Sequence, residues 1–201
     1  MSLPIPVPAP SWGDIVGLVR KPKLLAFLPK DDPSVQQVLG RAFFHAGVKN
    51  TSSIPITKAR VLVRVRKEGQ DVTSYLAKWD FTPEPFVAYA PNAAISPQLL
   101  VESQVHYVLP AVAETFALFV KFQGHDELYT FSPFSYLQPN LQLSPPLQVG
   151  EYSVEVIIAA ENYRGVFGLK VENHGSSFGD VRLSRFDNFT ASKGFKRMDW
   201  L

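Results

Sequence analysis

The chain has 201 residues, of which 46% are hydrophobic and 19% charged, and this is enough for one substantial core. The 20 Lys and Arg residues nearly balance the 18 Asp and Glu residues, so no strong positive field points to nucleic acid as a partner. The absence of cysteine excludes disulfides, cysteine-ligated metal sites and thiol catalysis. The 15 Phe, 7 Tyr and 17 Pro favour strands separated by proline-rich turns, and the sequence predicts a single all-β domain.

Residues 1–22 are expected to form an extended N-terminal arm. Proline occupies every second position of PIPVPAP, which fixes the backbone and removes hydrogen-bond donors. The following SWGDIVGLV is compatible with a short helix that Ser11 would cap. Apolar runs such as VEVIIAA are far shorter than the roughly 20 residues of a membrane-spanning helix. The compartment stays undetermined, and a membrane tether upstream of the given sequence is left open.

Residues 23–187 are expected to form a β-sandwich, because several segments alternate apolar and other residues at strand period. The clearest alternation is in 58–66, where four small or β-branched residues share one face: Ala59, Val61, Val63 and Val65. Further strands are predicted at 41–49, 115–123, 151–161 and 166–173, with shorter ones near 74–81, 128–131, 180–186 and within 99–109. The segment 115–123 is expected to place four apolar side chains together: Phe116, Leu118, Val120 and Phe122.

Three aromatic segments are expected to pack over this sandwich. Two are the proline-rich connections 82–97 and 132–148, which carry large apolar residues. The third is the C-terminal tail 188–201. It contains Phe189, Phe195 and Trp200, and so many exposed aromatic side chains in a short segment would promote non-specific association.

Two stretches carry a resemblance to a known family. In VGEYSVEV (149–156), Tyr152 begins a long late strand, where immunoglobulin-like sandwiches often have a corner tyrosine. In VKNTSSIPITKARVLVRV (48–65), Val48 and Asn50 precede a small polar turn and a strand led by Ala59. This stretch resembles the strand, turn and strand of bacterial cell-adhesion-related domains and their immunoglobulin-like relatives. The resemblance implies an immunoglobulin-like antiparallel β-sandwich, and the family's function implies a role in adhesion or display. The long insertions and the basic second strand depart from the family pattern.

A basic row on the strand 58–66 is one candidate site. Lys58, Arg60, Arg64 and Arg66 recur at strand period and could contact phosphates or other anions. The structural interpretation is that acidic residues of the late strand, Glu151, Glu155 and Glu161, neutralise the row across neighbouring strands. We favour the structural interpretation, because a sheet face in contact with water normally carries charges.

Aromatic residues near the proline-rich loops are a second candidate site, here for carbohydrate. The candidates are Trp79, Phe86, Tyr89, Phe134 and Tyr136.

A glycoside hydrolase-like enzyme with Asp80 and Glu84 as its carboxylate pair is a further alternative. However, the sequence has no nucleophile elbow, phosphate-binding loop or zinc-protease motif, and no cofactor or metal site is predicted. We therefore expect a non-enzymatic interaction or structural module, with a protein as partner, a glycan as the alternative and nucleic acid disfavoured.

Overall fold

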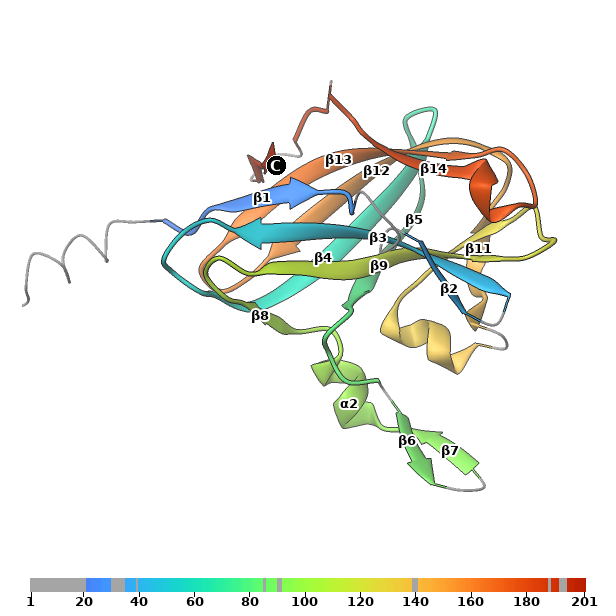
Figure 1. Cartoon of the computed structure of the whole chain (residues 1–201), viewed down its shortest axis with the longest axis horizontal. Coiled ribbons are helices and arrows are strands. Elements are labelled where there is room, and N and C mark those ends of the chain that lie inside the picture. Colours follow the sequence, from blue (N-terminus) through green and yellow to red (C-terminus); the bar gives the residue numbers. More distant parts are fainter. Residues whose placement is uncertain are drawn as a thin grey trace, which may run out of the picture.

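Figure 1 shows the computed structural model of the chain. It describes residues 21–29, 35–38, 40–84, 86–89, 92–138, 141–187, 189–191 and 195–201, and it describes the backbone alone for 35–38, 86–89, 92–95 and position 144. Nearly all of the predicted N-terminal arm therefore lies outside the described residues.

The described chain is built almost entirely of strands. The strands of the main sheet are β1 (Leu24–Phe27), β2 (Val35–Val38), β3 (Arg41–Asn50), β4 (Ile56–Lys67), β5 (Gln70–Trp79), β8 (His106–Val108), β9 (Ala113–Phe122), β10 (Leu128–Thr130), β11 (Leu143–Leu147), β12 (Gly150–Ala159), β13 (Arg164–Asn173), β14 (Val181–Arg185), β15 (Lys196–Arg197) and β16 (Asp199–Trp200). A separate hairpin contains β6 (Phe86–Tyr89) and β7 (Asn92–Ile95), and the short helical elements are α2 (Pro97–Glu102), η1 (Pro133–Leu137) and η3 (Phe178–Asp180).

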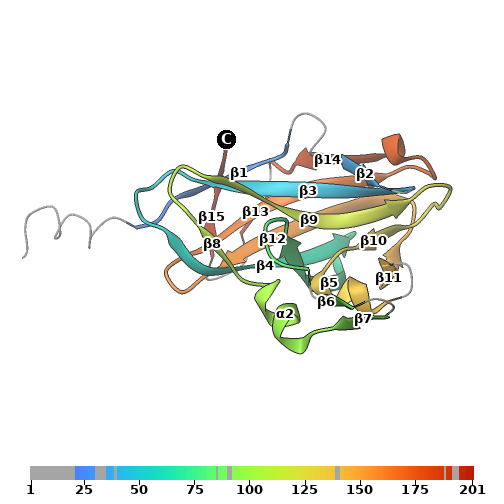
Figure 2. The same ribbon diagram turned by 60° about the horizontal axis from the view of Figure 1, so that its bottom comes forward.

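The main sheet is continuous and curls into a half-barrel (Figures 1 and 2). Its strand order is β14-β13-β12-β4-β5-β9-β3-β1-β16, with β2, β8, β10, β11 and β15 attached beside this path. The all-β prediction is confirmed. An immunoglobulin-like sandwich of two sheets is not confirmed, because each strand from β14 to β16 is hydrogen-bonded to the next.

The alternation predicted for the long strands is found in the core. On β4, Ala59, Val61, Val63 and Val65 face inward and are fully buried. A two-residue turn joins β4 to β5, and both of its residues, Glu68 and Gly69, have positive φ (52° and 82°), as the tightest hairpins require. The inner faces of β3, β12 and β13 complete the same cluster. The concave side of the curled sheet is thus the core of the domain.

The prediction that four apolar side chains of β9 share one face is wrong for the second half of the strand. Phe116 and Leu118 lie in the main core as expected, but Val120 and Phe122 belong to a second cluster on the outer face, and Phe119 points inward instead. The register with β3 shifts opposite Phe44 and His45, which is the mark of a β-bulge. A bulge inserts one residue and reverses the alternation that follows it.

Two segments differ from the strand and loop predictions. The segment 99–109 begins as helix α2, because Ser96 caps the helix by accepting from the amide of Leu99 and Pro97 occupies its first turn; only residues 106–108 form the strand β8. The connection 82–97 contains the β6–β7 hairpin, which stands away from the main sheet together with α2 (Figure 1). The expectation that this connection packs over a sandwich is wrong. Within the described chain, no helix has the length and apolarity needed to cross a membrane.

Two apolar clusters cover parts of the outer face of the sheet. Phe131, Tyr136 and Leu141, from the segment around η1, pack on β3 and β9. Phe189 and its neighbours Phe186, Ala191 and Phe195 pack on Ile157 of β12 and Val166 of β13. Ile157 and Val166 point away from the main core and are buried only because the C-terminal segment covers them.

The C-terminal residues also bridge the two ends of the curled sheet. β15 runs parallel to β13, and the amide of Met198 donates to the carbonyl of Val166 (2.8 Å). β16 runs parallel to β1, and the ring of Trp200 meets Phe167 of β13 edge to face, with centroids 5.3 Å apart. This clasp of residues 196–201 therefore connects β13 to β1.

A buried polar network joins the C-terminal ends of β9 and β13. The ammonium of Lys121 is fully buried and donates to Asn173 Oδ1 (2.8 Å) and to the carbonyl of Asp126 (3.0 Å). Asn173 Nδ2 donates to the same carbonyl (2.7 Å). Burial lowers the pKa of Lys121. Nearby, the hydroxyl of Tyr152 donates to the carbonyl of Gln148 (2.9 Å).

Candidate functional site

Trp79, the first of the carbohydrate-binding candidates, is inaccessible. Its side chain is 0% exposed, its Nε1 donates to the carbonyl of Ala59 (3.1 Å), and its ring meets Phe116 edge to face at 5.2 Å. A sugar must reach the face of an aromatic ring to stack on it, so the assignment of Trp79 to a glycan site is wrong. This tryptophan is a core residue whose indole N–H satisfies a backbone acceptor of β4.

The other loop aromatics do not join Trp79 on one surface. Phe134 and Tyr136 lie on η1; Phe134 is 41% exposed, whereas Tyr136 packs on Phe131 with ring centroids 5.7 Å apart. Burial and a hydrogen bond to Glu84 raise the pKa of Tyr136. The side chains of Phe86 and Tyr89, on β6, lie outside the described residues.

The carboxylates considered for glycoside hydrolysis are tied to internal partners. Asp80 Oδ1 lies 3.4 Å from His45 Nε2, and Glu84 Oε1 lies 3.3 Å from the ammonium of Lys78. Lys78 also donates to the carbonyls of Trp79 and Thr82 (3.1 and 3.2 Å). These contacts fix the chain where β5 leaves the sheet, which is a structural role.

Two arginines of the basic row are neutralised within the sheet. Arg64 lies directly opposite Glu155 of β12, with Nη1 3.4 Å from Oε2, and Arg66 Nε lies 2.6 Å from Asp71 Oδ1. Arg66 Nη2 also lies 3.9 Å from Glu155, whose side chain is only 2% exposed. The expected neighbour relation between β4 and β12 is confirmed. Glu151, the other acidic residue expected to serve these arginines, pairs with Lys170 of β13 instead (2.9 Å).

Lys58 is neutralised at the surface. Its ammonium lies 2.7 Å from Glu161 Oε1, and both side chains are more than half exposed. The hydrogen bond raises the pKa of Lys58 and lowers that of Glu161. Lys58 has a φ of 52° and lies in a bulge of β4 between Ile56 and Ala59, so its side chain leaves the regular row.

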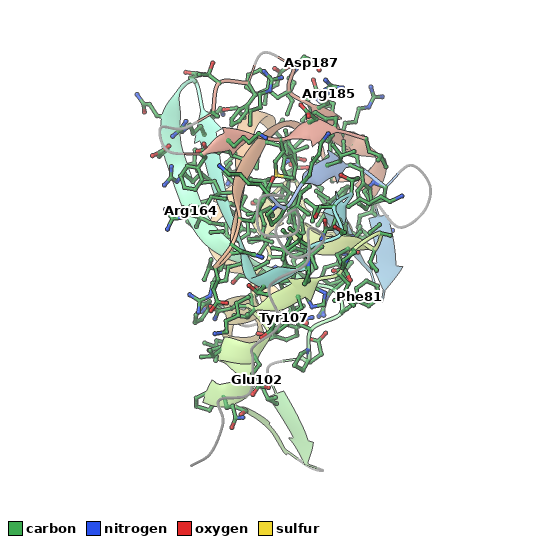
Figure 3. All side chains as sticks on the ribbon, turned by 90° about the vertical axis from the view of Figure 1, so that its left-hand side faces the viewer. Phe81, Glu102, Tyr107, Arg164, Arg185 and Asp187 are labelled. Atoms are coloured by element: carbon green, nitrogen blue, oxygen red, sulfur yellow. The ribbon has the colours of Figure 1, made fainter. Side chains whose placement is uncertain are left out.

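Arg60 differs from its neighbours because the strand beside it supplies no carboxylate. It is exposed and lies opposite Ala159 of β12, and Arg164 of β13 lies opposite the same Ala159 from the other side. Neither guanidinium forms an ion pair with any residue that the structure describes. In Figure 3, Arg164 lies at the outer margin of the sheet.

These arginines line a groove at the end of the sheet where β12 turns into β13. A hollow of about 590 Å³ is bordered by Lys58, Arg60, Val105, Ala159, Ala160, Glu161, Arg164 and Phe195. A second hollow of about 480 Å³ shares Ala160, Glu161 and Arg164 with it and adds Lys21, Pro22, Asn162, Tyr163 and Lys196. We call the two together the basic groove. Among the described residues, five cationic side chains and one carboxylate line it, so it attracts anions.

Sequence reasoning identified only part of this groove. Lys58 and Arg60 belonged to the predicted basic row, whereas Arg164, Lys21 and Lys196 were missed. Arg164 stands in ENYRG, a stretch that reads as a turn, and it becomes a neighbour of Arg60 only through the register of three strands. The signal that could have found it is the Ala159 position, where the predicted acidic face of the late strand carries no acid.

No protein-family model matches the chain, and no curated protein or solved structure matches it significantly. Among the described residues, His, Asp and Glu side chains form no group of three that could hold a metal ion.

Proposed function

We propose that this chain is a non-enzymatic interaction module whose basic groove binds an acidic segment of a partner protein. One observation carries the proposal: Arg60 and Arg164 flank Ala159 in an open groove with no carboxylate partner among the described residues, while Arg64 and Arg66 are neutralised internally. Charge that the fold leaves uncompensated is available to a partner.

The carboxylates near the end of β5 favour a structural role over catalysis. Asp80 pairs with His45 and Glu84 pairs with Lys78, and Lys78 also donates to the carbonyls of Trp79 and Thr82. An immunoglobulin-like relationship, and the adhesion or display role that it implies, remain predictions from the sequence.

Binding of a short glutamate-rich peptide, measured by calorimetry at low salt, tests the proposal. We expect Arg60→Ala and Arg164→Ala each to weaken binding several-fold and the double variant by about tenfold or more, because an exposed charge contact contributes up to about 1 kcal/mol. Arg182→Ala, on the exposed β14 edge, removes the same charge outside the groove and is expected to change binding little. Equal peptide affinity for the wild type and the double variant would refute the proposal.

A further inference from the structure

The outer face of β4, β12 and β13 contains two comparable rows, and only one is complete. In the first row, Arg64 lies opposite Glu155, which in turn lies opposite Gly168. Four residues further along β12, the second row consists of Arg60, Ala159 and Arg164. The first row thus has a cation and its own carboxylate, whereas the second has two cations around a methyl group. The anion that would complete the second row is not supplied by β12.

The spacing of the strands suits a single anion held by both arginines. Neighbouring strands are about 4.8 Å apart, so the backbones of Arg60 and Arg164, on either side of β12, are separated by about 10 Å. Two long side chains rising from these positions can converge above the small Ala159. Each guanidinium presents donors in a planar fork that suits carboxylate or phosphate oxygens.

The charge of the groove favours a doubly charged anion over a single carboxylate. Glu161, the only carboxylate among the described residues that line the groove, is already bound to Lys58. Arg60, Arg164, Lys21 and Lys196 remain without a carboxylate partner among the described residues. A carboxylate is satisfied by one bidentate arginine, whereas a phosphate monoester carries a charge of about −1.5 to −2 and three acceptor oxygens.

We propose that the seat formed by Arg60 and Arg164 over Ala159 binds a phosphoryl group. The inference rests on the proposed function and specifies its ligand: the acidic segment of the partner carries a phosphorylated side chain, whose oxygens occupy the place that the Glu155 carboxylate fills in the neighbouring row. Val105 and Phe195 give the groove apolar walls beside this seat.

The experiment compares three peptides of one neutral sequence, carrying phosphoserine, glutamate or serine at the central position, by calorimetry with the full chain. We expect the phosphoserine peptide to bind about tenfold or more tightly than the glutamate peptide, because its phosphoryl group has nearly twice the charge and enough oxygens to engage both arginines, whereas one bidentate arginine satisfies a carboxylate. Inorganic phosphate alone is measured in parallel. If it competes for the same seat with equal affinity, the seat is confirmed as one for free phosphate, and the phosphorylated partner segment is rejected.

Two substitutions of Ala159 distinguish the effect of an added charge on phosphopeptide binding from the effect of an added side-chain volume. Ala159→Glu supplies within the sheet the carboxylate that the second row lacks, so phosphopeptide binding should fall by about tenfold or more while the thermal midpoint stays at or above that of the wild type. Ala159→Gln has nearly the same size without the charge and should retain most of the binding. Equal loss in both variants would show that occlusion, not charge, governs the site, and would overturn the assignment.

The outcomes also distinguish this inference from the proposed function. If the phosphoserine and glutamate peptides bind equally and Arg60→Ala weakens both, the groove binds acidic segments and the phosphoryl assignment fails. If no peptide and no phosphate binds the wild type, both proposals fail.

Discussion

The contact between Phe189 and Gly168 makes a quantitative prediction about how the C-terminal segment is held on the sheet. Phe189 is 8% exposed, and a Cβ added at Gly168 would overlap the Cγ atom of the Phe189 ring. The ring therefore occupies the space that a side chain on β13 would need. The effects of Phe189→Ala and Gly168→Ala on the free energy of unfolding should therefore depend on each other.

The expected free energies follow from burial and overpacking. Phe189→Ala uncovers Ile157 and Val166 and should lower the free energy of unfolding by about 3 kcal/mol, the low end for a buried Phe→Ala change, because the site lies at the surface and can partly collapse. Gly168→Ala should cost about 1–2 kcal/mol, because the ring must move to admit the methyl group. In the double variant the methyl group enters the vacated space, so the two costs should fall short of additivity by about 1–2 kcal/mol.

Urea unfolding of the four proteins of this double-mutant cycle measures the coupling, with Phe134→Ala as a control at an exposed aromatic that should change stability by less than about 0.5 kcal/mol. Additive effects of Gly168→Ala and Phe189→Ala, or a Phe189→Ala protein as stable as the wild type, would refute this account of how the tail packs.

Three further predictions concern single groups. Trp79→Phe should lower the free energy of unfolding by about 1–3 kcal/mol, because a buried carbonyl loses its donor, and the native fluorescence from a buried indole should disappear. Lys121→Met should be destabilising, since it removes the donor to Asn173. Folding lowers the pKa of Lys121, so between the lowered pKa and 10.5 the unfolded wild type binds more protons than the folded wild type, and its stability rises with pH. The difference in stability between the wild type and Lys121→Met should therefore widen as pH rises towards 10.5. Lys58→Met should be less stable than the wild type near neutral pH and equal to it in acid, because folding lowers the pKa of Glu161 from 4.5 and the stabilisation is lost as pH falls through the lowered value. Urea midpoints measured across pH check both lysine variants, and a gap independent of pH would contradict the assigned ion pair or buried amine.

The parts of the fold that follow from local alternation could be predicted from the sequence. The inward face of β4 is the predicted one, because one buried face requires apolar residues at every second position. The bulge opposite His45 could not be predicted, because adjacent apolar residues in FALFVKF fit either face and only the partner strand selects one. Curling into a half-barrel likewise depends on pairings between distant strands, which alternation does not encode.

The candidate site was predictable to the same limited extent. The arginine row is visible at strand period, and so is an acidic row on the late strand. Whether a given arginine is neutralised depends on which residue lies opposite it, and a change of register by two residues would place Glu155 or Glu161 at other positions. The sequence therefore predicted compensation along the whole row, whereas the structure compensates Arg64 and leaves Arg60 open.

The position of the C-terminal segment explains why the groove lies where it does. Phe189 covers the outer face at Ile157 and Val166, and β15 then pairs with Gly165 and Val166, at the very start of β13. Phe195 and Lys196 consequently line the basic groove instead of covering it. The apolar cover that Phe189 and its neighbours form on the outer face thus ends before Arg164, and Arg60 and Arg164 are accessible beyond it. A ligand in the groove would contact this segment as well as the sheet, so binding should also stabilise the clasp against detachment.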